Sequence, residues 1–194
     1  SSAASDVYKR QVQISDEPAF ALRGMMLDVG RYYMSPAFIK ELMRRVSRYK
    51  INTLHLHLTD DPAWRLEVKK FPALTDRVFH WKSRLPGKFY TQEQLKELVD
   101  YCAGLNIQVI PEIDMPGHSQ AFRKALNVKM SDEKATKALV ALIKEMCSLV
   151  PKEKMPIIHI GTDEAHGKDE QVNDDILKEY IHACLLYTSP SPRD

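Results

Sequence analysis

Residues 107–119 read IQVIPEIDMPGHS, an apolar run that ends in a group of polar side chains. A short apolar run of this kind predicts a buried β-strand over Ile107–Ile113. Glu112, Asp114 and His118 lie at or just beyond its carboxyl end. Strands that are buried on both faces are typical of parallel sheets covered by helices, and such sheets bind ligands at the carboxyl ends of their strands. The stretch therefore predicts an α/β protein with a site at one edge of a parallel sheet.

The same apolar pattern occurs at three other places. We expect further strands at residues 21–28 (ALRGMMLD), 51–58 (INTLHLHL) and 156–161 (PIIHIG). Apolar residues at helical spacing and capping signals predict helices over 36–49, 91–104, 131–149 and 170–185. A long loop with several prolines separates the second strand from the second helix. Four successive strand-then-helix units predict a parallel sheet covered by helices.

Each predicted strand ends in polar residues that could do chemistry. They are Asp28 and Arg31 after the first strand; His55, His57, Asp60 and Asp61 with the second; Glu112, Asp114 and His118 with the third; and His159, Asp163, Glu164 and His166 with the fourth. The α/β barrels place their active sites at this end of the strands, and open α/β sheets also gather ligands there. No GxGxxG or GxxxxGK[ST] loop follows a strand, so a nucleotide site is weakly supported.

The composition excludes several classes of protein. The 194 residues include 28 Lys and Arg against 26 Asp and Glu, a net charge of +2, which argues against nucleic acid as the main partner. No apolar run approaches the roughly 18 residues of a membrane span. Three cysteines, Cys102, Cys147 and Cys184, match no zinc-ribbon or CxxC pattern, and we interpret them as small buried or half-buried thiols.

The two ends differ from the rest of the chain. Residues 1–11 and 186–194 resemble translated adaptor sequence, and natural disordered tails are the alternative. We therefore expect one partial catalytic domain over 12–185. No signal peptide is visible, so the cellular compartment is left open.

Asp163-Glu164 is the most informative pair of residues. A pair of neighbouring carboxylates can divide the work of acid and anion. They are poorly arranged to flank a glycosidic bond, since ordinary retaining glycosidases hold two carboxylates about 5–5.5 Å apart across that bond. A neighbouring pair suits a different division of labour, in which one protonates the leaving oxygen and the other steers a nucleophile that belongs to the substrate. An acidic loop or helix start with no catalytic role is the plain alternative.

Four motifs give the chain a specific resemblance. They are RGMMLDVGRYYMS (23–35), YKINTLHLHLTDDPAWRLEV (49–68), QVIPEIDMPGHS (108–119) and HIGTDEAH (159–166). In this order they resemble the first half of the catalytic barrel of glycoside hydrolase family 20 β-N-acetylhexosaminidases. The resemblance implies a partial (β/α)8 TIM barrel, about its first four β/α units. A whole barrel has eight such units and typically about 250 residues, so we expect these 194 residues alone to be inactive.

The resemblance also implies roles for individual residues. Glu164 matches the general acid/base, and Asp163 matches the carboxylate that orients the 2-acetamido group of the substrate, whose oxygen is the nucleophile. Arg31 matches the arginine that holds sugar hydroxyls. The remaining matches are Asp60, a supporting acid, and Asp114 with His118, an acid–histidine pair behind the general acid.

The expected substrates are glycans with terminal β-linked N-acetylglucosamine or N-acetylgalactosamine, or chitooligosaccharides, and the family implies neither a cofactor nor a metal. One departure from the family pattern lies beside the acid, where Thr162 replaces the glycine or other small residue of many members.

Other residues are interpreted as structural. His55 and His57 point to one face of a strand and are expected inside the barrel, as is His159. Trp64 and Arg65 are expected to brace the long loop, where Trp81 fits either a sugar platform or ordinary packing.

Two other functions remain open. A metal-dependent amidohydrolase-type barrel would use His55 and His57 as ligands together with His118, His159 and Asp163. That reading leaves Glu164 without a role. A non-catalytic sugar-binding barrel is the second alternative.

Overall fold

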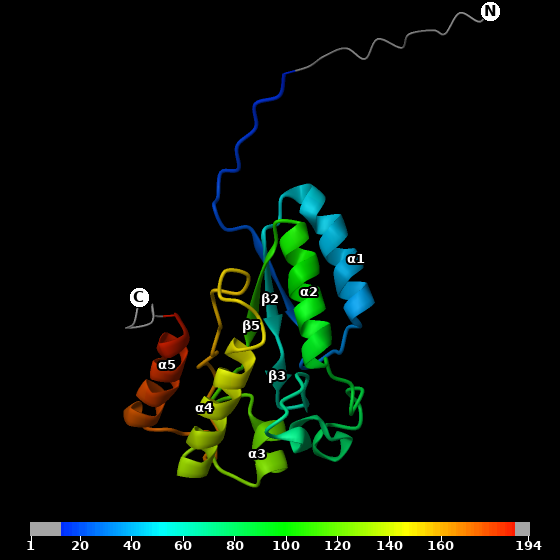
Figure 1. The fold of residues 1–194 in the computed structure, drawn as a ribbon. Coiled ribbons are helices and arrows are strands. Elements are labelled where there is room, and N and C mark those ends of the chain that lie inside the picture. Colours follow the sequence, from blue (N-terminus) through cyan, green and yellow to red (C-terminus); the bar gives the residue numbers. More distant parts are fainter. Residues whose placement is uncertain (1–12, 189–194) are drawn as a thin grey trace, which may run out of the picture.

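The computed structural model describes residues 13–188 and builds them around a three-stranded parallel sheet. Its strands are β1 (Gly24–Asp28), β2 (Thr53–His57) and β5 (Gln108–Glu112), in the order β1-β2-β5. Their arrowheads point toward the end of the molecule where α3 (Gln120–Leu126) lies (Figure 1). The register pairs Asp28 with His57 and His57 with Glu112, so three polar residues stand side by side at the carboxyl end of the sheet.

Two helices with well-formed starts pack against each other beside the sheet (Figure 1). The first, α1 (Pro36–Val46), begins where the Ser35 side chain accepts a hydrogen bond from the Phe38 amide. The second, α2 (Gln92–Gly104), begins at Thr91, which forms a reciprocal capping box with Gln94. Such boxes satisfy amide groups that have no partner inside the helix. The sequence signals for both starts are therefore confirmed, although a short 3₁₀ turn, Ser47–Tyr49, follows α1 where the sequence predicts continuing helix.

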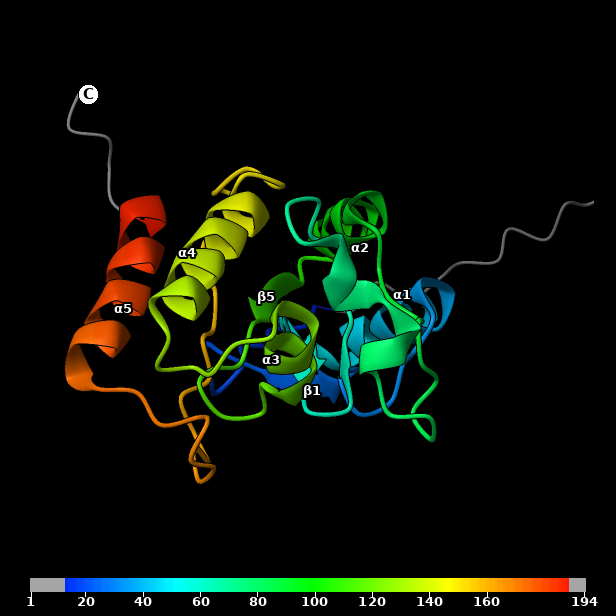
Figure 2. The same ribbon diagram turned by 90° about the horizontal axis from the view of Figure 1, so that it is seen from below.

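The later helices form a second group. The expected long helix is α4 (Glu133–Cys147), and it packs against α5 (Asp174–Thr188), as both ribbon views show (Figures 1 and 2). The prediction ended the last helix at 185, which is wrong by three residues, because α5 continues through Thr188. Once a helix has formed, each added residue gains a backbone hydrogen bond at little further cost. The segment 1–11, and 189–194 of the predicted tail, lie outside the described residues.

The predicted fourth strand, 156–161, is reduced to one parallel bridge between Glu112 and His159. The His159 amide donates to the Pro111 carbonyl at 3.0 Å, and the Ile113 amide donates to the His159 carbonyl at 3.0 Å. The backbone then turns into the left-handed region at Gly161, with φ 67°, so extended pairing stops. The segment occupies the expected place beside β5, but it is not a regular strand.

Residues 59–90 form an ordered loop rather than a featureless one. A two-stranded hairpin, β3 (Thr59–Asp60) with β4 (Ala63–Trp64), precedes two 3₁₀ turns, Pro72–Thr75 and Arg77–Phe79. Arg65 is fully buried and donates to the carbonyls of Val29, Leu85, Lys88 and Arg84.

These hydrogen bonds confirm that Arg65 braces the loop against the end of β1. Burial lowers the pKa of its guanidinium to about 10. Trp64 also braces the loop, because its indole donates to the Leu66 carbonyl at 2.7 Å and its ring packs beside Phe122.

The hydrophobic core lies between the sheet and the helices and includes Leu54, Leu56 and Val109 from the strands. Cys102 and Cys147 are buried, as the sequence suggested, while the side chain of Cys184 lies outside the described part. Among the described residues, no helix combines the length and the apolar character needed to cross a bilayer.

Candidate active site

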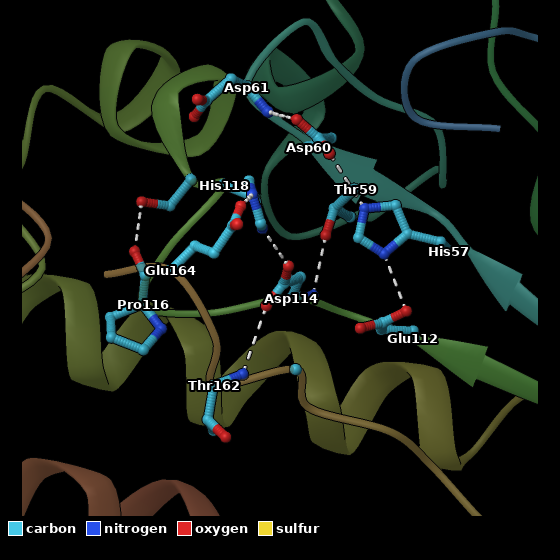
Figure 3. A network of polar contacts seen from close by, with 12 residues as sticks. His57, Thr59, Asp60, Asp61, Glu112, Asp114, Pro116, His118, Thr162 and Glu164 are labelled. Atoms are coloured by element: carbon cyan, nitrogen blue, oxygen red, sulfur yellow. Dashed lines mark hydrogen bonds and ion pairs between the residues drawn. The ribbon is translucent and has the colours of Figure 1, made fainter. Parts of the chain in front are cut away.

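A chain of polar contacts crosses the carboxyl ends of the three strands. Glu112 on β5 contacts Nδ1 of His57 on β2 through its Oε2, at 2.7 Å. The other ring nitrogen of His57, Nε2, lies 3.1 Å from Oδ2 of Asp60 (Figure 3). The same Asp60 oxygen is 3.0 Å from Nη2 of Arg31, whose Nη1 contacts Asp28 at 2.9 Å. We call Glu112, His57 and Asp60 the inner relay.

With two protons, His57 can donate to both carboxylates of the inner relay. Each ring nitrogen faces a carboxylate oxygen, and a neutral imidazole has only one N–H to donate. Burial lowers the pKa of His57, but hydrogen bonds to Asp60 and Glu112 outweigh it and raise that pKa to about 10. The inner relay is therefore an imidazolium held between two carboxylates.

A second relay with the same order of side chains, an acid, a histidine and an acid, stands beside the first. His118 places Nδ1 2.6 Å from Oδ2 of Asp114 and Nε2 3.1 Å from Oε2 of Glu164 (Figure 3). Burial raises the pKa of Asp114. Burial lowers the pKa of His118, but its hydrogen bond to Asp114 and the neighbouring carboxylates outweigh it, so the net shift is upward. We call Asp114, His118 and Glu164 the outer relay; the rings of His57 and His118 are 6.3 Å apart in a T-shaped arrangement.

The backbone around Glu164 is shaped by two glycines. A Cβ on Gly117 would lie 2.3 Å from the carbonyl oxygen of Asp163, so only glycine admits this close approach. A Cβ on Gly161 would lie 1.6 Å from Oδ1 of Asp114. The Thr162 amide donates to that same oxygen at 3.3 Å, which fastens the segment carrying the acid to the segment carrying the histidine.

The carboxylates of the Asp163-Glu164 pair open to solvent, unlike those below them. The Glu164 side chain is 64% exposed, and Asp163 is also exposed. Asp163 places a carboxylate oxygen within 4.8 Å of ligand atoms of both Asp114 and His118. Glu164 has a positive φ of 50° and His118 one of 49°, conformations that non-glycine residues rarely adopt. The pair thus sits on unusual backbone at the mouth of the site, with buried acids behind it.

All six residues selected from the sequence lie at this end of the sheet. Five of them contact one another: Arg31 contacts Asp60, and His118 contacts both Asp114 and Glu164. Sequence reasoning assigned no role to Glu112, which is also buried, with 4% of its surface exposed.

Three histidine rings lie close to the carboxylate of Glu112. Besides His57, its carboxylate lies 2.8 Å from Nε2 of His55 and 3.1 Å from Nδ1 of His159. The expectation that His55 and His57 share one face of β2 is therefore confirmed. Alternation along β5, which puts Glu112 and Asp114 on one face, is the sequence signal that could have identified Glu112.

The structure places the ligands expected for a metal site in two separate groups. His55 and His159 group with Glu112, whereas His118 and Asp163 group with Asp114. The proposed ligands therefore do not form one cluster among the described residues. In addition, Nδ1 of His159 accepts the Gly161 amide at 3.0 Å and is already engaged. The arrangement favours proton and hydrogen-bond chemistry on an oxygen-rich ligand.

The family of the chain follows from its sequence. The model of the catalytic domain of glycosyl hydrolase family 20 matches residues 20–137, more than half of the chain. The chain belongs to this family. The beta-hexosaminidase of Vibrio furnissii is 36% identical over 188 residues, covering 79% of this chain and 30% of that protein. The beta-hexosaminidase of Porphyromonas gingivalis is 48% identical over 114 residues, covering 57% of this chain and 14% of that protein.

Solved family 20 structures share the fold. The exo beta-N-acetylglucosaminidase of Vibrio harveyi, in complex with N-acetylglucosamine, matches with a TM-score of 0.77 and 27% identity, over 90% of this chain and 35% of that one. A mutant beta-hexosaminidase of Streptomyces plicatus, in complex with its product GlcNAc, matches with a TM-score of 0.78 and 29% identity, over 89% of this chain and 38% of that one. This family 20 chain is a partial TIM barrel and spans little more than a third of these solved chains, and less of the curated relatives.

Proposed function

We propose that the enzyme containing this chain is a β-N-acetylhexosaminidase. It removes terminal β-linked N-acetylglucosamine or N-acetylgalactosamine from glycans or chitooligosaccharides. The observation that carries the proposal is the outer relay, in which the solvent-facing Glu164 is held by His118 directly beside Asp163. An exposed acid with a histidine behind it and a second acid next to it is what a substrate-assisted glycosidase requires.

In the proposed mechanism, Glu164 donates its proton to the glycosidic oxygen, and the bond from that oxygen to the anomeric carbon breaks. The acetamido oxygen of the substrate attacks the anomeric carbon and forms an oxazolinium-type intermediate. Asp163 orients the acetamido group and balances the positive charge that develops on it. Glu164 then removes a proton from water, which opens the intermediate with retention of configuration. Enzymes that use the substrate's own acetamido group are a known exception to the scheme with two opposed carboxylates.

The other selected residues support these two. Arg31 presents a guanidinium fork, suited to paired hydrogen bonds with sugar hydroxyls, and its carboxylate partner Asp60 fixes the fork from below. His118 keeps the Glu164 carboxylate in one orientation, and Asp114 keeps the imidazole in place. Asp60 and Asp114 are each at most 3% exposed, so their proposed contribution to sugar binding acts through Arg31 and His118.

The names of similar proteins support the choice of substrate. One relative, 38% identical over 130 residues, is the N,N'-diacetylchitobiase of Vibrio harveyi, and it covers 57% of this chain and 15% of that protein. Two of the matching solved structures hold N-acetylglucosamine. A single N-acetylated sugar at the carboxyl ends of the strands is therefore the ligand we propose.

The test is hydrolysis of aryl β-N-acetylglucosaminides by the complete barrel enzyme. Glu164→Gln should lose most activity on substrates with poor leaving groups and retain more on good ones, since only poor leaving groups need the proton. Asp163→Asn should lower activity for all leaving groups. Glu133→Gln, which neutralises an exposed carboxylate on α4, is the matched control and should hydrolyse normally. Undiminished hydrolysis by both active-site variants would overturn the assigned roles.

A further inference from the structure

We propose that Glu112 and His57 are positioning residues, which hold Asp60 and through it keep Arg31 in its sugar-binding orientation. The inference rests on the proposed function, because it takes Arg31 as the group that holds the sugar. Neither Glu112 nor His57 is placed in contact with substrate. Their effect on the substrate would pass through the side chains of Asp60 and Arg31.

The contacts form an unbroken line from the interior to the surface. Along this line Glu112, His57, Asp60 and Arg31 meet at 2.7, 3.1 and 3.0 Å in turn. The first three residues are 4, 5 and 3% exposed, whereas the Arg31 side chain is 46% exposed. The line thus runs from three buried side chains to an exposed guanidinium that can reach a ligand.

The order of charges explains why each member needs the next. The line alternates carboxylate, imidazolium, carboxylate and guanidinium, so each charge has an oppositely charged neighbour, and Arg31 has a second one in Asp28. A buried charge is tolerated only when it is paired and hydrogen-bonded. Replacing Glu112 with a neutral amide leaves Asp60 as the one carboxylate of the relay beside His57. Asp60 must then balance the positive charge of His57 alone while it also pairs with Arg31.

The surroundings of Glu112 strengthen the case that its charge matters. Its two oxygens face His55, His57 and His159, while the register also brings Asp28 beside His57. Asp28 contacts Arg31 directly at 2.9 Å, so the guanidinium is held from two sides, by the end of β1 and by the relay. Loss of the relay would leave Arg31 tied only to Asp28, three residues away in the chain.

The experiment compares Glu112→Gln with Glu145→Gln in the complete barrel enzyme. Glu145 is a matched control, because its carboxylate is likewise held by hydrogen bonds, which it accepts from the Lys69 and Lys70 amides and the Gln92 side chain. We expect Glu112→Gln to lower kcat/KM for an aryl β-N-acetylglucosaminide roughly 10- to 100-fold, mainly through KM, and Glu145→Gln to leave it unchanged. In an Arg31→Lys background, Glu112→Gln should cost little more, since coupled residues are not additive.

Several outcomes would overturn the proposal. Equal kinetics for Glu112→Gln and Glu145→Gln would do so, as would losses that add fully to those of Arg31→Lys. Should Glu112→Gln fail to fold, His57→Gln takes its place with the same expected coupling to Arg31. A measurement without substitution is the ¹⁵N NMR spectrum of the wild-type histidines, in which a neutral His57 at pH 8 contradicts the relay. Failure of the wild-type enzyme to hydrolyse any β-N-acetylhexosaminide would instead reject the proposed function.

Discussion

The inner and outer relays share one hydrogen-bonding pattern but differ in where they are built. In each, a histidine lies between two carboxylates, with closely similar distances of 2.7 and 3.1 Å around His57 and 2.6 and 3.1 Å around His118. His57 belongs to a regular strand and is 5% exposed. His118 lies on the connection after β5, and its partner Glu164 is largely exposed.

This difference in construction suits the two relays to different roles, one supporting and one catalytic. Strand residues are fixed by the sheet register, so the inner relay holds its geometry without backbone strain. The outer relay depends on left-handed backbone at His118, Thr162 and Glu164, and unusual backbone of this kind is concentrated at functional sites. Binding and catalytic groups also favour loops on rigid scaffolds. We infer that the inner relay acts as the support and that the outer relay faces the substrate.

The largest expected effect comes from moving the outer relay alone. Gly117→Ala would place a Cβ 2.3 Å from the Asp163 carbonyl oxygen and displace the segment that carries Glu164. We expect activity of the complete enzyme to fall by about 100-fold or more, because misplacement by about 1 Å can cost that much. Gly104→Ala is the control, since a Cβ there meets open space within 4 Å. Activity assays with thermal unfolding check both variants, and full activity of Gly117→Ala would show that the close approach is unimportant.

The inner relay should be visible in the pH dependence of stability. The pKa of His57 is raised from 6.5 to about 10, so its stabilising effect is fully present below about pH 6.5 and is lost as the pH rises through about 10. The free energy of unfolding of the wild type should therefore exceed that of His57→Gln most strongly near pH 6.5 and approach it near pH 10. Urea unfolding at several pH values measures this difference. A gap between wild type and variant that is constant with pH would contradict a charged His57.

The smallest expected effect concerns backbone strain at Thr162, beside the outer relay. Thr162 has φ 91°, where a β-branched side chain is disfavoured and glycine is not. Thr162→Gly should stabilise the folded protein by about 1 kcal/mol, because relief of about 1–3 kcal/mol of strain exceeds the added chain entropy of glycine. Chemical unfolding of the two proteins checks the sign. A less stable glycine variant would mean that the Thr162 side chain makes contacts worth more than the strain.

Local signals predicted much of this molecule. The capping residues Ser35 and Thr91 mark the starts of α1 and α2, and the apolar runs locate β1, β2 and β5 to within a few residues. The short helix α3 escaped prediction because seven residues carry too little periodicity. The irregular 156–161 segment was predicted as a strand because its composition is that of one, whereas its pairing depends on neighbours distant in sequence.

Six residues of the candidate site could be selected from the sequence, but the role of Glu112 and the contacts between residues could not. Asp163 and Glu164 were identifiable because two acids follow an apolar run after a single residue, Thr162. The pairing of His57 with Glu112 could not be inferred, because it depends on the register between strands 55 positions apart. Similarly, only the fold shows that Gly117 lies against the backbone of Asp163.

The most direct test is a crystal structure of the complete enzyme with N-acetylglucosamine bound. The account predicts that the sugar contacts Arg31, Asp163 and Glu164, with the acetamido group against Asp163. His57 and Glu112 should remain out of contact and keep their hydrogen bond of 2.7 Å. A sugar bound away from the carboxyl ends of the strands, or one that contacts the inner relay directly while Glu164 stays remote, would contradict it.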